Sequence, residues 1–366
     1  MDPVKIDTFT IYKYSLPLKK PLYVGGKDVH SREGLIIRIT SEDGEEGFGD
    51  IAPLKHLSKE SLFEATEQTR KLRELILDQD FPEHLERLQG GFTRWLDFLK
   101  LSSSVRFGFE LAALNLLSNR KKIPLGKLIH ASIQDKIQVN GLLHGTKEEI
   151  KQQAQKMIEQ GFKAFKLKVG ADVDEEIEKV QAISKFIEGK AILHLDANQS
   201  WDINKAVHFG NEVGLTTVDY IEEPFKNIKD IPDFFMKTTI PAALDESLQS
   251  IPIKDLKSID GLEIIVLKPT ALGGIERAHQ MIQEAKNVGL STVISSCYES
   301  GVGILALANL AGISSYYHGA GLDTLKWFEE DVLKEPVAIS HGKIDISHRM
   351  VRSKDINFDV LEKISP

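Results

Sequence analysis

Residues 191–224, AILHLDANQSWDINKAVHFGNEVGLTTVDYIEEP, contain the pattern that decides the fold. A β-rich run, AILHLD, is followed by a segment of helix length and then by a second β-rich run, TVDYIEE. Strands that alternate with helices in this way pair in parallel, because a crossover of helix length carries the chain back to the start of the next strand. This stretch therefore predicts one strand–helix–strand unit of a parallel sheet.

The same alternation extends to both sides of this unit. After Lys136 the β-rich runs begin at Ile137, Lys163, Ala191, Thr217, Pro241, Gly261, Ser291 and Ser314. Eight strands with crossovers between them are the count of a (β/α)8 TIM barrel. A doubly wound open sheet is the alternative, but it usually has fewer strands, and no G-x-G-x-x-G motif follows an early strand. We therefore predict an α/β protein with a TIM barrel.

The residues before the barrel show a different pattern of apolar residues. Apolar residues alternate from Val4 to about Ile51, and Asp43-Gly44 between two such runs is a strong hairpin signal. Helical periodicity follows from Ser58 to Leu77, where Ser58 suits an N-cap. We predict an α+β domain at residues 1–133, the barrel at 134–330, and a C-terminal segment at 331–366 that packs back on the first domain.

Composition narrows the class of protein. The 366 residues carry 54 acidic and 46 basic side chains, a net charge of -8, which gives no basic footprint for nucleic acid. One cysteine excludes an internal disulfide and a cysteine-built metal site. The N-terminus has no apolar signal-peptide core, and no run of 18 apolar residues is present. We expect a cytoplasmic protein, with no membrane partner, that acts on small molecules.

Ionisable residues end five consecutive predicted strands. Barrel enzymes carry their chemistry at these carboxyl ends, and side-chain parity shows which residues point inward. Where the apolar neighbours face the helices, the inward-directed residues are Lys166 and Lys168, then Asp196 (in phase with His194 and Asn198), Glu222, Asp245 and Lys268. Taken alone, Asp245 is as well explained as a helix cap. The succession of five strand ends favours a joint site.

Three carboxylates at neighbouring strand ends would repel one another unless a cation neutralised them. Oxygen ligands without His or Cys suit a hard ion, so we predict Mg²⁺ bound by Asp196, Glu222 and Asp245, with Mn²⁺ as an open alternative. The lysines flank this set on both sides. A nearby dication would lower a lysine pKa toward the working pH, so that one lysine could move a proton while the other stabilises a carbanion.

The pieces KLKV, LDAN, IEEP, LDES and LKP are similar to those of the enolase superfamily. A Lys or His base beside one or two Mg²⁺ ions is the known arrangement of such sites. The K-x-K strand end with a lysine after the sixth strand resembles the muconate-lactonising-enzyme subgroup. Within it, GFGDIAPL, SSCYESGVGILALANLA and GLDTL resemble the o-succinylbenzoate synthase family. The chain departs from that family's loop at Cys297, Gly301 and Val302, and His194 stands where some synthases have Arg.

This resemblance implies a TIM barrel with an α+β capping domain and a dehydration. The implied substrate is 2-succinyl-6-hydroxy-2,4-cyclohexadiene-1-carboxylate of menaquinone biosynthesis. Lys168 would be the base, and Lys268 the cation on the opposite face of the ring. Lys166, Asn198 and Ser296 are the expected substrate contacts. The resemblance leaves open whether the chain is a monomer or a homo-oligomer.

Other enzymes share the same catalytic set. A dipeptide epimerase, an N-succinylamino acid racemase or a cycloisomerase would carry the same lysines and acids. Dipeptide epimerases usually have a D-x-D motif at the eighth strand, whereas this chain reads HGAGLDT, with Asp323 alone, which favours the synthase. A Schiff-base aldolase would use Lys168 or Lys268 covalently. A binding protein without activity is disfavoured, because the five-residue set is intact.

Overall fold

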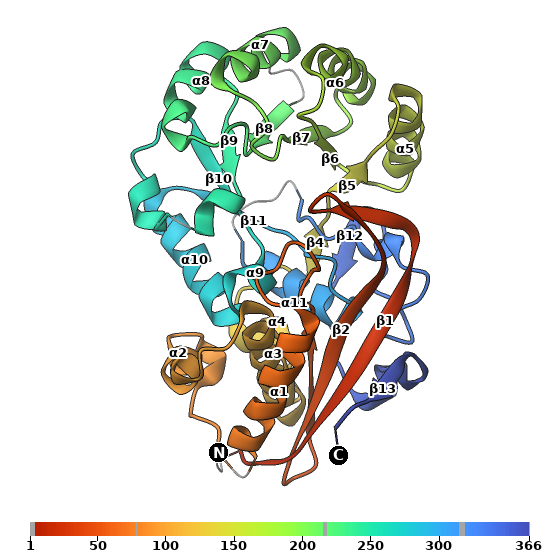
Figure 1. The fold of residues 1–366 in the computed structure, drawn as a ribbon, viewed down its shortest axis with the longest axis vertical. Helices are drawn as coiled ribbons and strands as arrows, with labels where there is room; N and C mark the ends of the chain where they lie inside the picture. The colour runs from red at the N-terminus through yellow and green to blue at the C-terminus, as the bar shows by residue number, and fades with distance from the viewer. Residues whose placement is uncertain (1–3, 78, 215–217, 250, 315–318, 366) are drawn as a thin grey trace.

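The computed structural model describes residues 4–77, 79–214, 218–249, 251–314 and 319–365. In Figure 1 a barrel-like part lies above a second part that holds the long antiparallel strands and both chain ends. Within the described ranges, no helix combines the length and apolar character that crossing a bilayer requires.

A seven-stranded parallel sheet forms the barrel wall. Its strands, each bonded to the next, are β5 (Gly141–Leu143), β6 (Ala164–Lys168), β7 (Ile192–Asp196), β8 (Val218–Glu222), β9 (Ala242–Leu244), β10 (Leu262–Leu267) and β11 (Ser291–Ile294). Parallel bridges from Val139 to Ala320 and from Ser295 to Gly321 connect both edges of the sheet to one segment. That segment closes the barrel. The predicted eighth strand, SSYYHG from Ser314, falls mostly on residues 315–318, outside the described residues. The TIM-barrel prediction is confirmed.

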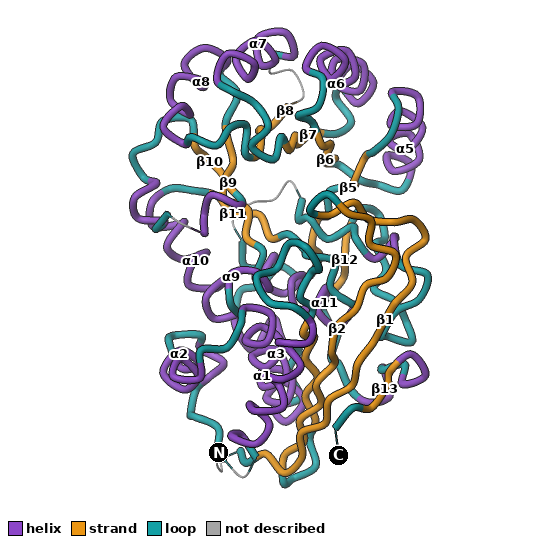
Figure 2. The backbone as a smooth tube through the Cα atoms, viewed as in Figure 1, coloured by secondary structure: helices purple, strands orange, loops and turns teal. Residues whose placement is uncertain are grey.

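Helices cover the outside of this sheet (Figure 2). They are α5 (Lys147–Glu159), α6 (Val173–Ile187), α7 (Ile203–Val213), α8 (Ile231–Thr238), α10 (Ile275–Val288) and α11 (Gly301–Ala311), whereas the short α9 (Pro269–Leu272) lies against α3 (Ser103–Lys121) and α10. Thr146 begins α5 with a capping box, because its hydroxyl accepts from the Glu149 N–H while the Glu149 carboxylate accepts from the Thr146 N–H. Local sequence therefore sets where this crossover helix starts.

Strand parity separates two apolar layers. Outward residues such as Phe165 and Leu167 join the main core against the helices. A second cluster, formed by Tyr220, Ala243, Ile264, Val266 and Val293, is separate from that core. Tyr220 and Val266 precede Glu222 and Lys268 by two residues, so they share the face of those residues. The barrel interior is thus apolar deeper inside and carries ionisable side chains at its mouth.

The capping domain is built on a four-stranded antiparallel sheet with the order β13-β1-β2-β3, in which β13 is Leu361–Lys363. Its elements are β1 (Ile6–Val24), β2 (Lys27–Ser41), β3 (Glu46–Ile51), α1 (Leu62–Ile76), α2 (Gly91–Leu96), α3 (Ser103–Lys121) and α4 (Leu125–Ile129). The hairpin at Asp43-Gly44 is confirmed by the pairing of β2 with β3. The predicted cap Ser58 is wrong. Ser61 caps α1 in a capping box with Glu64, while the Ser58 hydroxyl accepts from the Leu54 N–H at 2.8 Å.

The C-terminal segment pairs with strands of both the barrel domain and the capping domain. Strand β12 (Lys343–Asp345) pairs with β4 (Lys136–Gln138), and β13 (Leu361–Lys363) pairs with β1. The amide of Asn119 on α3 donates to the Val351 carbonyl at 2.8 Å. The boundaries at residues 133 and 330 stay predictions.

Two buried carboxylates join the capping domain to the barrel. Glu110 on α3 accepts from the Arg106 guanidinium and from the Glu276 N–H at the start of α10, both at 2.8 Å. Glu276 accepts in turn from the Thr93 N–H and hydroxyl on α2, at 2.8 Å each. Burial raises the pKa of Glu110 to about 7, against the lowering effect of its hydrogen bonds and of Arg106.

We expect Glu110 to make stability depend on pH. Its pKa is higher in the folded than in the unfolded chain, so its contribution is complete below about pH 4.5 and is lost as the pH rises through about 7. The unfolding free energy relative to Glu110→Gln should fall by about 3 kcal/mol over this range. Thermal unfolding of both proteins between pH 4.5 and 8 measures it, with Glu284→Gln on the exposed face of α10 as control. Parallel curves for wild type and Glu110→Gln would contradict it.

Candidate active site

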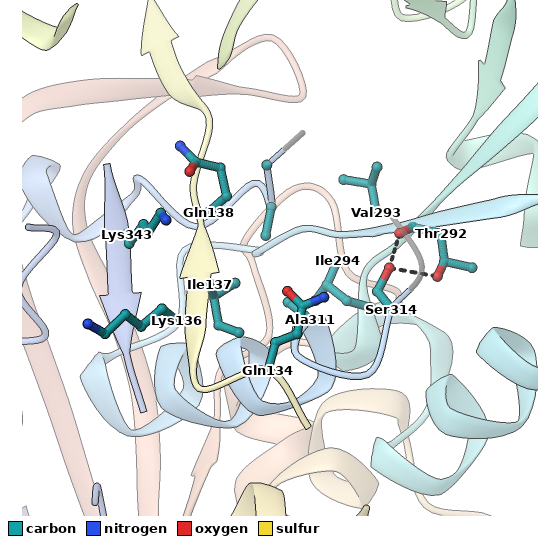
Figure 3. Close-up of a pocket in the computed structure, with 12 residues that line it drawn as sticks. Gln134, Lys136, Ile137, Gln138, Thr292, Val293, Ile294, Ala311, Ser314 and Lys343 are labelled. Carbon is teal, nitrogen blue, oxygen red and sulfur yellow. Dashed lines mark hydrogen bonds between the residues drawn. The ribbon is translucent and has the colours of Figure 1, made fainter. Parts of the chain in front are cut away.

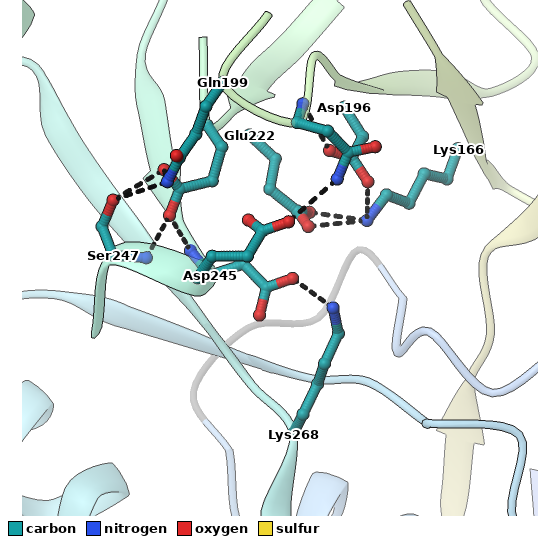
Figure 4. Close-up of polar contacts among 10 residues, drawn as sticks. Lys166, Asp196, Gln199, Glu222, Asp245, Ser247 and Lys268 are labelled. Atoms are coloured by element: carbon teal, nitrogen blue, oxygen red, sulfur yellow. Dashed lines mark hydrogen bonds and ion pairs between the residues drawn. The ribbon is translucent and has the colours of Figure 1, made fainter. Parts of the chain in front are cut away.

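The ionisable strand ends predicted from the sequence meet at one place (Figure 4). Lys168 lies beside Asp196 in the register of β6 and β7, and Asp196 lies beside Glu222 in the register of β7 and β8. Asp245 directly follows β9 and Lys268 directly follows β10. The parallel register puts all five at the carboxyl end of the sheet, where barrel enzymes carry their chemistry.

Lys166 connects two of the carboxylates. Its Nζ lies 3.0 Å from Asp196 Oδ2 and 2.7 and 2.8 Å from the two Glu222 carboxylate oxygens. Burial alone would lower the pKa of Lys166, but Asp196 and Glu222 outweigh it and raise the pKa well above its ordinary value. Lys166 is therefore a fixed cation in this arrangement.

The buried carboxylates respond in opposite ways. Burial and the charges of Asp196 and Asp245 raise the pKa of Glu222 to about 8, despite Lys166. Burial also acts to raise the pKa of Asp196, but Lys166, Lys168 and Lys268 hold it below its ordinary value. The excess of negative charge is thus felt most strongly at Glu222, the fully buried member.

Asp245 and Lys268 form the other half of the site. The Lys268 ammonium bonds to Asp245 Oδ2, whereas the Lys166 ammonium bonds to Asp196 and Glu222 (Figure 4). Burial would lower the pKa of Lys268, yet Asp245 raises it above its ordinary value. In strand order, the three carboxylates lie between the lysines of β6 and the lysine after β10, as the sequence indicated.

Glu223, outside the predicted ligand set, holds the end of β9 in place. Its carboxylate accepts from the Asp245 N–H at 2.8 Å and from the Ser247 N–H at 2.7 Å, and its other oxygen accepts from the Gln199 amide at 2.9 Å. The backbone of Glu223 has a positive φ of 44°, a region that non-glycine residues rarely adopt. This buried residue therefore fixes where Asp245 points.

The donor set suits a divalent cation, although the carboxylate oxygens bond to lysines. Across the described ranges, no three His, Cys, Asp or Glu side chains are placed closely enough to hold a metal ion jointly. Asp196, Glu222 and Asp245 nevertheless offer buried oxygen donors from three successive strands, which is the chemistry that Mg²⁺ and Mn²⁺ prefer. Coordination by all three would require these side chains to come closer together than they lie here.

Comparison with known proteins agrees with this geometry. Residues 149–350 match the family model described as Enolase C-terminal domain-like, and residues 6–116 match MenC, N-terminal domain. The o-succinylbenzoate synthase of Haemophilus influenzae is 30% identical over 332 residues, which cover 89% of this chain and 92% of that protein. The chain belongs to the o-succinylbenzoate synthase family of the enolase superfamily.

A plant relative shows the same likeness inside a longer protein. The chloroplastic protein PHYLLO of Arabidopsis thaliana is 30% identical over 379 residues, which are 91% of this chain but only 22% of PHYLLO. Among solved structures, the muconate lactonizing enzyme of Pseudomonas fluorescens has a TM-score of 0.83 at 23% identity, with 94% of each chain covered. The barrel with its capping domain is therefore the fold of this superfamily.

The remaining predicted residues lie around the site with different surroundings. Lys168 is exposed at the barrel mouth. Asn198 donates its amide to Glu246 Oε1 at 3.0 Å, and its N–H to Asp196 Oδ1 at 3.2 Å. Ser296 is buried, and its hydroxyl lies 2.9 Å from that of Thr324. The roles of all three stay predictions.

The loop after β11 is fixed by a residue that sequence reasoning missed. Arg32 on β2 is 2% exposed, and it donates to the Tyr298 carbonyl at 2.8 Å and to the Cys297 carbonyl at 3.3 Å. It also donates to the Pro53 carbonyl at 2.8 Å and to that of Ala52. Its only sequence signal is an arginine in SREGL, too common to single out. Arg32 thus ties the capping domain to a loop beside Lys268.

Cys297 in this loop agrees with its interpretation as a packing residue. It is buried, and burial raises the pKa of its thiol to about 12, so the nucleophilic thiolate is scarce at neutral pH.

A cavity of about 210 Å³ lies elsewhere, beside β4, β11 and β12 (Figure 3). Lys136, Gln138 and Thr292 are among its lining residues. The lining includes β11 from Thr292 to Ile294 but none of the carboxylates and lysines of the candidate site. We assign it no part in the chemistry.

Proposed function

We propose that this chain is an o-succinylbenzoate synthase of menaquinone biosynthesis. It dehydrates 2-succinyl-6-hydroxy-2,4-cyclohexadiene-1-carboxylate to o-succinylbenzoate in a syn elimination that depends on Mg²⁺. The observation that carries this proposal is the group of carboxylates Asp196, Glu222 and Asp245 between lysines from β6 and from the end of β10. Membership of the synthase family, at 30% identity along most of the chain, supports the same reaction.

The three carboxylates are the proposed metal ligands. When bound, a divalent cation supplies Lewis-acid stabilisation of the negative charge that develops on the substrate carboxylate. Glu222 has the strongest need for such a cation, because burial and its neighbours raise its pKa to about 8. Glu223 keeps Asp245 in position through the Asp245 N–H.

Lys168 is the proposed base. It is exposed at the mouth, where a substrate can reach it, and its strand neighbour Asp196 is one of the proposed ligands. The Lys168 amine would remove the proton next to the substrate carboxylate. The resulting ammonium would then return that proton to the departing hydroxyl on the same face, so that water leaves and the ring becomes aromatic.

The other polar residues have binding roles in this proposal. The cationic Lys268 would lie against the opposite face of the ring and stabilise the developing carbanion. Lys166, whose ammonium bonds to Asp196 and Glu222, would contact the substrate together with Asn198 and Ser296. The capping domain would exclude water from the mouth.

An absorbance assay tests the proposal directly. The purified chain with Mg²⁺ should convert the cyclohexadiene substrate to the aromatic product, and excess EDTA should abolish conversion. Restoration by added Mg²⁺ or Mn²⁺ would show which ion serves. Conversion that survives EDTA, together with borohydride trapping of a carbonyl substrate, would indicate a Schiff-base enzyme. Epimerisation of dipeptides without dehydration would place the chain among the alternatives of the same subgroup.

A further inference from the structure

A polar cluster beside β5 is not used by the proposed chemistry. It contains Asp323 and Lys326, which follow the segment that closes the barrel, together with Lys19 and Lys20 on β1. The side chain of Asp323 is 6% exposed and that of Lys326 is 30% exposed. In Figure 1 the hairpin that joins β1 and β2 extends toward β5, so that capping domain and barrel meet there.

Asp323 and Lys326 bond to the same residue of β5. Asp323 Oδ2 accepts from the Leu142 N–H at 3.2 Å, and Lys326 Nζ donates to the Leu142 carbonyl at 3.1 Å. The two side chains also form an ion pair with each other. Leu142 pairs with Lys166 in the register of β5 and β6, so the Lys326 ammonium contacts the strand next to the one that carries Lys166. Adjacent strands are only about 4.8 Å apart.

The same segment contacts both neighbouring parts of the mouth. Thr324 bonds to Ser296 at the end of β11, and the Lys326 carbonyl accepts from Lys19 Nζ at 3.0 Å. The Trp327 ring lies 4.9 Å from the ring of His144, just beyond β5. Burial, Lys326 and Lys20 together lower the pKa of His144, so this ring is neutral at pH 7. These contacts hold the backbone of the segment that carries Lys326.

The charge of the cluster fits an anion. Asp323 is neutralised by Lys326 and engaged by the Leu142 N–H, so it offers no free carboxylate to a substrate ammonium group. Lys19 and Lys20 are exposed next to this pair and add positive charge. A partly exposed ammonium with fixed geometry binds a carboxylate more strongly than a free surface lysine, because less side-chain entropy is lost.

We propose that Lys326, positioned by Asp323 and flanked by Lys19 and Lys20, binds the terminal carboxylate of the succinyl arm and so selects dicarboxylate substrates. This inference rests on the proposed function, in which the ring carboxylate is bound at Asp196, Glu222 and Asp245. In the closed barrel the segment with Lys326 lies between β5 and β11, across the mouth from the ends of β7, β8 and β9 that carry the three acids, so a substrate with carboxylates at both ends bridges the mouth. A monocarboxylate of the same shape fills only the first position.

Binding of the reaction product tests this without turnover. Calorimetry would compare o-succinylbenzoate with 2-butyrylbenzoate, in which a methyl group replaces the terminal carboxylate. Lys326→Gln should weaken binding of o-succinylbenzoate about 10- to 100-fold, the usual range for one charge-assisted hydrogen bond, and leave 2-butyrylbenzoate unchanged. In turnover, KM should rise by the same factor while kcat stays within about twofold.

Two further variants separate recognition from folding. Asp323→Asn with Lys326→Gln removes both charges, so no unpaired buried carboxylate remains, and it should show the same loss of preference. Lys237→Gln on α8, another lysine in an ion pair with an aspartate, should change neither ligand. Equal preference in wild type and Lys326→Gln, with or without a lower melting temperature, would overturn the inference. A wild type that dehydrates nothing would instead refute the proposed function.

Discussion

Replacing Lys168 with alanine is expected to lower kcat by about 10³- to 10⁴-fold, near the upper range for loss of a general acid–base group. The variant loses both the base and the acid of the proposed elimination. Folding should be unaffected, because the Lys168 side chain is exposed and packs into no core. Steady-state rates of aromatic product formation measure the loss, and calorimetry with Mg²⁺ alone checks that the carboxylates still bind the ion.

The matched control is Lys163→Ala. Lys163 is also exposed and directly precedes β6, at the opposite end of the strand from Lys168. It should retain wild-type turnover. Small primary amines added to Lys168→Ala should restore part of the rate, because a diffusible base can occupy the space that the side chain leaves. Near-normal turnover by Lys168→Ala without added amine would remove Lys168 from the mechanism.

Most of the site prediction came from the alternation of side chains along each strand. Once LDAN, IEEP and LDES were assigned to strand ends, a period of two fixed which acids point inward, and the register of β7 and β8 places Asp196 beside Glu222 as expected. This worked because the apolar neighbours, such as Leu195 and Ile221, are fully buried against the helices. Where one face of a strand is buried, a single sequence shows which side chains point to each side of the sheet.

Partner choice within the site was not readable in the same way. The sequence did not predict the partners of Lys166, whose ammonium bonds to Asp196 and Glu222 in the structure. A lysine has a long flexible chain, so parity gives the face of the sheet but not the final contact. The predicted N-cap of α1 was wrong because Ser58 and Ser61 both precede the helix. Only the backbone geometry selects Ser61.

Contacts between distant segments were beyond sequence reasoning. Arg32 and Tyr298, or Lys326 and Leu142, are brought together by closure of the barrel and by docking of the capping domain. No local sequence period marks such pairs, because each of these residue types is also common at ordinary surface positions. The hydrogen bonds of Glu223 to the end of β9 belong to the same class.

Replacing Asp196 with asparagine is expected to weaken Mg²⁺ binding by at least about 100-fold, since even outer partners of metal sites contribute about 10- to 100-fold. Asparagine keeps the size of the side chain but removes one of three negative charges. The pKa of Asp196 is held below its ordinary value, so this residue is anionic at neutral pH and its charge is available to a cation. Titration calorimetry with Mg²⁺, and the Mg²⁺ concentration for half-maximal activity, should shift together.

The lysines make this test stringent. In Asp196→Asn the Lys166 ammonium loses one of its two carboxylate partners and keeps Glu222. If the acids only neutralised lysines, the variant would lower thermal stability and leave the Mg²⁺ dependence of activity unchanged. If they are ligands, excess Mg²⁺ should partly restore turnover. Asp233→Asn on α8, which removes an acid from a surface ion pair with Lys237, is the control and should change neither measurement. An unaltered Mg²⁺ titration for Asp196→Asn would therefore separate the carboxylates from the metal.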